Sequence, residues 1–146
     1  PTDSLRDLGV NVHSNLKPSL HCSTIVAKAN VRAKLILKCF LSRNPTNFIR
    51  AFKCYVRPLL EYSSVVWNPW LLQDINLIES VQRNFTRKVC ILCNLPTMSY
   101  EERLNYFNLV KLELRRLHFD LIELFKIIND FTVCSLKNVL RFANAN

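Results

Sequence analysis

The chain has 146 residues, the size of one ordinary domain. Hydrophobic residues make up 49% of it and the net charge is +9, so it has enough apolar material for a core and does not belong to the disordered class. Gly9 is its single glycine. This excludes the dinucleotide-binding, Walker A and nucleophile-elbow loops, which each need more than one glycine, and it argues against a β-rich fold.

The N-terminal segment predicts one short strand. Apolar and polar residues alternate over 8–12, and a period of two is typical of an extended chain. Pro18 then breaks the pattern. Because the chain starts at Pro1 and not at Met, we expect a fragment or a processed product, in which residues 1–18 are a strand remnant and a connector.

Two amphipathic helices are predicted next, over 19–42 and over 47–67, separated by an Asn-Pro pair. Pro58 is expected to kink or divide the second helix near Val56. The expected inner faces are Val26, Ala29, Ala33, Ile36, Leu37 and Phe40 in the first helix, and Phe48, Phe52, Tyr55, Leu59, Tyr62 and Val66 in the second.

A third helix is predicted from Asp74, as its N-cap, through Leu92. A capping box at Ser99–Glu102 predicts a short helix that runs to about Phe107. The inner face of the third helix is expected to be Ile75, Ile78, Val81, Gln82, Phe85 and Val89.

The last long helix is predicted over 112–129, because apolar residues recur there at intervals of four and three. The repeating residues of this helix are Val110, Leu114, Leu117, Leu121, Leu124 and Ile128. The tail, 134–146, has a weaker pattern that predicts at most a short final helix. The predicted fold class is all-α: an irregular helical bundle of four to five long helices with a short N-terminal strand remnant. We expect Phe52, Tyr55, Leu59, Phe85, Leu117, Leu121 and Leu124 to be largely buried.

All of the net charge comes from one stretch. Residues 8–60 contain nine basic residues and no acid, while the other eleven basic residues are matched by eleven acids. The alternative interpretation is a solvated helix face, but such faces normally mix both signs. We expect the basic stripes of these two helices to lie side by side and to bind phosphates. The candidate nucleic-acid-binding residues are Lys28, Arg32, Lys34, Lys38, Arg43, Arg50, Lys53 and Arg57.

No catalytic or metal site is predicted. Cys90 and Cys93 form a CxxC, but no second ligand pair with a zinc spacing accompanies it, so we interpret both as core thiols. His21 and Cys22 are adjacent in a predicted helix and point about 100° apart, which does not suit a base and its nucleophile. The acids are dispersed, unlike the carboxylate cluster of a two-metal enzyme.

A series of short motifs follows the same order as in a known family. The motifs are DLGV at 7–10, VRPLLEY at 56–62, VWNP at 66–69, IESVQRNFTR at 78–87, SYEERL at 99–104 and LELRR at 112–116. Over residues 3–130 the chain resembles the region just after the catalytic palm in reverse transcriptases of non-LTR (LINE-type) retrotransposons.

This resemblance implies a helical thumb-like domain over 19–133 that contacts an RNA/DNA duplex or hybrid and an upstream palm domain. The palm carries the polymerase carboxylates of the family, so this fragment is expected to be inactive alone and to need no cofactor. A thumb holds a duplex by its backbone, which suits the acid-free basic helices.

Two alternatives remain. The first is a helical protein-interaction module, or an inactive remnant of a retroelement, with no nucleic-acid role; the second, which we rank last, is an independent enzyme. No apolar run is long enough to span a membrane and nothing resembles a signal peptide. We interpret the six cysteines as reduced, which predicts an intracellular protein of the nucleus or cytoplasm.

Overall fold

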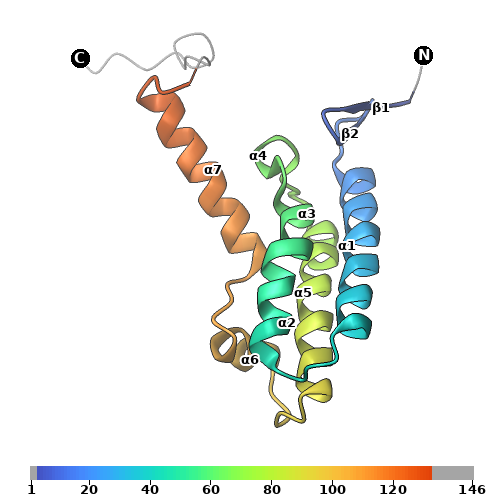
Figure 1. Cartoon of the computed structure of the whole chain (residues 1–146). Coiled ribbons are helices and arrows are strands. Elements are labelled where there is room, and N and C mark those ends of the chain that lie inside the picture. The colour runs from blue at the N-terminus through green and yellow to red at the C-terminus, as the bar shows by residue number, and fades with distance from the viewer. Residues whose placement is uncertain (1–2, 133–146) are drawn as a thin grey trace.

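The computed structural model describes residues 3–132 and is mostly helical, with one small two-stranded sheet (Figure 1). The main feature of the predicted all-α class is thus confirmed. The predicted final helix after residue 133 lies outside the described residues. The helices are α1 (Ser19–Cys39), α2 (Pro45–Ala51), the π-helical turn η1 (Phe52–Val56), α3 (Arg57–Glu61), α4 (Ser64–Trp67), α5 (Leu72–Leu92), α6 (Tyr100–Tyr106) and α7 (Leu112–Ile128).

The N-terminal strand has a partner, contrary to the expectation of a lone remnant. Strands β1 (Ser4–Asp7) and β2 (Val10–His13) pair antiparallel and are joined by Leu8 and Gly9. Both joining residues have positive φ, 42° and 90°, as a tight two-residue hairpin requires. Tyr62 donates a hydrogen bond from its hydroxyl to the Leu8 carbonyl oxygen at 3.2 Å, which ties the hairpin to the helical body.

The helical body is built around α1 and α5, which run parallel and form its most extensive contact. At their N-terminal ends Ser19 Oγ donates to Asp74 Oδ2 at 2.6 Å, and beyond their C-terminal ends Arg43 Nη1 donates to the Leu92 carbonyl at 3.1 Å. Asp74 lies in the first turn of α5 and is not its N-cap, which is Leu71. The aspartate therefore joins two helices where the sequence predicts that it caps one.

The second predicted helix is divided close to the expected place. Between α2 and α3, η1 forms a π-helical turn in which the Arg57 N–H reaches the carbonyl of Phe52, five residues back. The wider turn shifts the inner face by one residue, so Val56 and Leu60 follow Phe52 into the core. Tyr55, predicted to be buried, is 60% exposed for this reason.

The second predicted helix also ends early. It stops at Glu61, and Ser63, at φ 52°, separates it from the short α4. Tyr62 and Val66, both predicted to face inward, are consequently exposed.

The capping box and the inner face of α5 are confirmed. Ser99 and Glu102 exchange the two capping hydrogen bonds at the start of α6. On α5 the predicted inward residues are buried, except for the half-buried Ile75. Phe85 packs on Phe52 with ring centroids 4.8 Å apart, which joins α5 to η1 at the centre of the core.

Helix α7 has its predicted extent but the opposite orientation. It turns a polar side to the body, where Arg116 Nε donates to Asn68 Oδ1 at 3.1 Å and the Asn68 amide donates to Asp120. The Leu112 N–H at its start donates to Glu79 Oε2 at 2.8 Å. The residues of the apolar repeat are exposed. The prediction that Leu117, Leu121 and Leu124 are buried is therefore wrong. Leu59 of α3, also predicted to be buried, is half-buried.

Within residues 3–132, no helix combines the length and the apolar character needed to cross a membrane.

Candidate nucleic-acid interface

The eight candidate basic residues do not form one surface. Lys34 and Lys38 line depressions between α1 and α5, whereas Arg50, Lys53 and Arg57 line depressions that face α6 and α7. The expectation that the two stripes lie side by side is corrected accordingly. Helix α1 packs on α5 as well as on η1 and α3, and the two stripes point to different neighbours.

The first basic surface is the α1–α5 groove, which we define by Lys34, Lys38, Arg87 and Lys88. It consists of two depressions of about 350 and 290 Å³ with Lys34, Leu37 and Lys88 in common. Of the described residues that line it, none carries a carboxylate. The other lining residues are Asn30, Ala33, Leu37, Val81, Asn84, Phe85, Ile91 and Leu92. Four cations without a counter-charge around an amide-bearing surface suit a phosphate chain.

Sequence reasoning missed Arg87 and Lys88, because it counted them against the acids in the same half of the chain. Glu79 is nine residues before Lys88 on α5, so the two side chains point about 180° apart. Glu79 is buried and accepts hydrogen bonds from Tyr100 and Leu112 on the far side of the helix. A helical-wheel projection of residues 72–92 separates Lys88 from Glu79, but it places Arg87 only about 80° from Glu79.

Lys28 and Arg32 lie on another flank of α1. Arg32 and Lys34 are two residues apart on the helix, so the angle between the directions of their side chains is about 160°. On the Lys28 side, His21 packs against Trp67 with ring centroids 4.9 Å apart and accepts a hydrogen bond on Nδ1 from the Asn11 N–H at 3.1 Å. Burial lowers the pKa of His21, and the positive charge of Lys28 lowers it further.

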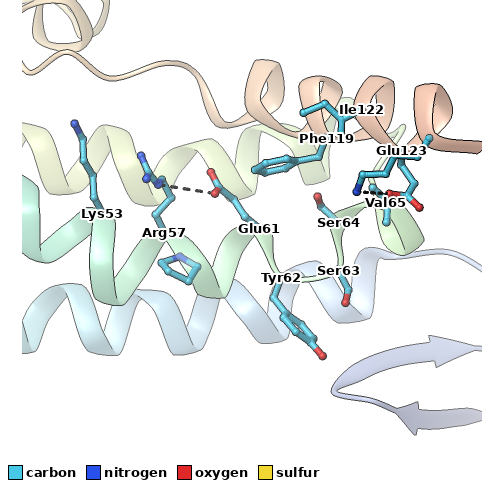
Figure 2. A pocket seen from close by; sticks show the side chains of 12 residues that line it. Lys53, Arg57, Glu61, Tyr62, Ser63, Ser64, Val65, Phe119, Ile122 and Glu123 are labelled. Atoms are coloured by element: carbon cyan, nitrogen blue, oxygen red, sulfur yellow. Dashed lines mark hydrogen bonds and ion pairs between the residues drawn. The ribbon is translucent and has the colours of Figure 1, made fainter. Parts of the chain in front are cut away.

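The second basic surface is the α2–α7 face, which we define by Arg50, Lys53 and Arg57. Lys53 contributes to two depressions, one of about 340 Å³ beside α6 and one of about 460 Å³ beside α7. Figure 2 shows Lys53 and Arg57 along one side of the larger depression, with Phe119 and Ile122 coming from α7.

Acids partly neutralise the α2–α7 face. Arg57 pairs with Glu61 at 3.8 Å, and Arg115 binds both oxygens of Glu61, at 2.5 and 3.1 Å. Burial, and after it the neighbouring Arg115, lowers the pKa of Arg57, whereas hydrogen bonding to Glu61 raises the pKa of Arg115. Glu123 also lines the larger depression and pairs with Lys126 at 3.3 Å. The positive charge on this face is therefore smaller than its basic residues alone suggest.

Arg43 has a structural contact of its own, since its guanidinium binds the Leu92 carbonyl at the C-terminal end of α5. Arginine at this end of a helix satisfies an unpaired carbonyl and the negative end of the helix dipole. Arg43 also favours the ionised form of Cys93, but burial dominates and raises the pKa of that thiol.

The cysteines give no metal centre within residues 3–132, where no group of three or more potential ligands lies together. Five cysteines are free there, and Cys134 lies outside the described residues. Burial raises the pKa of Cys22 to about 12, with a further contribution from Asp74, and also raises the pKa of Cys90. Thiols of this kind are protonated at neutral pH and suit the predicted core role.

No family model matches the chain, and no solved structure matches it. An uncharacterized protein of Caenorhabditis elegans is 28% identical to it over 115 residues, which is 79% of this chain and 58% of that protein. The chain thus spans less than two thirds of the length of this relative.

Proposed function

We propose that the chain is the thumb-like helical region of an RNA-directed DNA polymerase of a non-LTR retrotransposon, and that it holds a template–primer duplex by its phosphates. In this proposal the helices are an irregular bundle that follows a palm domain. The palm supplies the carboxylates and the chemistry, and the fragment alone is inactive. The ordered motifs from the DLGV at 7–10 to the LELRR at 112–116 support this assignment.

The observation that carries the duplex-binding proposal is the α1–α5 groove. Lys34 and Lys38 are one helical turn apart, about 6 Å along α1, and Arg87 and Lys88 face them from α5. Contacts of this kind fix the position of a backbone without reading its sequence. The groove therefore supports binding to duplexes of many sequences, with the phosphates as the common feature.

The test is the salt dependence of binding to a labelled RNA–DNA hybrid, measured by fluorescence anisotropy. If the four groove cations each contact a phosphate, log affinity falls with log salt at a slope of roughly −3 to −4. Changing Lys34, Lys38, Arg87 and Lys88 to glutamine should flatten the slope by about one unit per lost contact and leave the helix content unchanged.

A matched control removes the same charge from elsewhere. Arg6, Lys17, Lys111 and Lys126 are exposed and lie on β1, in the connector, at the start of α7 and in its last turn. Their change to glutamine should alter the slope less. Equal effects of the two sets, or no effect of either, would contradict the groove as the binding surface.

The alternative function, a helical protein-interaction module, is favoured by a different observation. The apolar repeat of α7 is exposed along the whole helix. A module of this kind binds through apolar contacts, which salt does not weaken, so the same titration separates the two functions.

A further inference from the structure

An apolar stripe runs along α7 and faces solvent. We define the α7 stripe by the six residues of the apolar repeat: Val110, Leu114, Leu117, Leu121, Leu124 and Ile128. The exposed fractions of these residues lie between 45% and 57%. Monomeric proteins seldom leave a continuous apolar surface of this length uncovered.

The stripe cannot turn inward without breaking the contacts that hold α7. Leu117 and Leu121 lie about 100° and 140° around the helix from Arg116, which is buried against Asn68. Arg115 is bound to Glu61 on the body side as well. Helix α7 also leans away from the other helices (Figure 1), and the side chains of the stripe are exposed.

The spacing of the stripe is that of a coiled-coil seam. Leu114, Leu121 and Ile128 occupy the a positions of a heptad, and Leu117 and Leu124 occupy the d positions. Ile122 and Phe125, which are 42% and 60% exposed, widen this apolar surface in the C-terminal half of α7. The heptad spacing points to another helix as the occupant.

We propose that the α7 stripe pairs with the same stripe of a second copy of the chain, as a parallel two-helix coiled coil. Fully burying a leucine-sized side chain removes on the order of 100 Å² of apolar surface from water. Two half-exposed stripes, with the exposed Phe125 at their edge, approach the roughly 1,000 Å² in total that a specific interface needs. A weak, concentration-dependent dimer is expected from this size.

The side chains beside the seam favour the parallel arrangement. In a parallel pair Glu113, at position g, lies near His118 of the partner subunit, at position e, whose ring N–H can donate to the carboxylate. An antiparallel pair would place Asp120 opposite its own copy, which like charges disfavour. No pair of like charges flanks the parallel seam between residues 113 and 125.

The test is the mass of the full chain in solution, measured by light scattering across micromolar concentrations without nucleic acid. The chain mass is 17.1 kDa, and the mass should rise towards twice this value with concentration. Leu117→Glu together with Leu121→Glu should keep the helix content and abolish the rise. The control, Leu35→Glu with Leu41→Glu, changes two exposed leucines elsewhere and should leave the dimer intact.

A cross-link tests the direction of pairing. With the exposed Cys39 and Cys54 changed to serine, Leu121→Cys should give a disulfide between equivalent positions under mild oxidation, because a positions face each other in a parallel pair. Leu117→Cys and Leu121→Cys cross-linking only to one another would indicate antiparallel pairing and overturn the parallel arrangement.

Two outcomes would overturn the proposal as a whole. A chain that stays monomeric at all concentrations would show that the stripe does not pair with its own copy. A dimer that survives the two glutamates would show that pairing uses another surface. Neither outcome depends on nucleic acid, so the duplex-binding proposal stands or falls separately.

Discussion

Phe85 and Leu121 are both apolar residues on regular helices, yet they have opposite surroundings. Phe85 is 1% exposed against Phe52, and Leu121 is 57% exposed on α7. Phe85→Ala should lower the free energy of unfolding by about 3–5 kcal/mol, because it leaves a cavity in the core. Leu121→Ala should lower it by less than about 1 kcal/mol in dilute protein.

Urea denaturation of the two variants checks this prediction, with the midpoint and the slope measured together. Equal losses from the two changes would mean that the exposed face of α7 is buried within a single chain.

His21 makes the stability of the fold dependent on pH. Its pKa is lowered in the folded state by burial and by Lys28, so the folded chain favours the neutral ring. The unfolded chain takes up this proton near pH 6.5, and the stability contribution is complete above that pH and is lost as the pH falls below it. The decline is at most about 1.4 kcal/mol for each pH unit.

Thermal melting between pH 7.5 and 5.5 measures the effect of His21. His21→Phe keeps a ring against Trp67 and should reduce the dependence on pH. An unchanged pH dependence in His21→Phe would exclude His21 as its source.

The thiols differ in accessibility and should differ in reactivity. Cys39 and Cys54 are exposed, whereas Cys22 and Cys90 are buried with raised pKa values. A maleimide at neutral pH should modify the first pair in the native protein and the second pair only after unfolding. Peptide mass spectrometry identifies the modified residues. Modification of Cys22 at the native rate of Cys39 would contradict the packing of α1 on α5.

At the scale of the elements, the α1–α5 groove and the α2–α7 face are the two candidate phosphate-binding surfaces. Arg50, Lys53 and Arg57 form a narrow row, but Glu61 and Glu123 lie among the residues around them. We therefore expect the triple change of Arg50, Lys53 and Arg57 to glutamine to flatten the salt slope less per charge than the change of the α1–α5 groove.

Both sets are measured on the same hybrid over the same salt range. A larger effect of the α2–α7 face per charge would restore it as the stronger binding surface.

Local sequence signals identified much of the element structure. The capping box at Ser99 and the break near Val56 depend on residues a few positions apart, and both are present in the fold. Periodicity also gave the membership of the α7 stripe. It could not show that the stripe faces outward, because the contacts that orient α7 join residues about fifty positions apart, such as Arg115 with Glu61 and Arg116 with Asn68.

The same limit applies to the candidate site. Counting charges along the chain found the acid-free stretch that contains Lys34 and Lys38. It did not find Arg87 and Lys88, because their membership of the groove depends on the packing of α5 against α1. The register shift at η1 was also hidden, since a π-helical turn has no reliable short motif.

At the scale of the whole molecule, the pairing of α1 with α5 has a consequence for the order of folding. Ser19 and Asp74, which join the starts of these helices, are 55 residues apart. During synthesis α1 therefore emerges long before its principal partner, and among the described elements it has β2, α2, η1 and α3 to contact in the meantime. We expect the ribosome-bound chain to remain loosely packed until α5 is complete, and a chaperone that shields apolar helices to act most usefully in that interval.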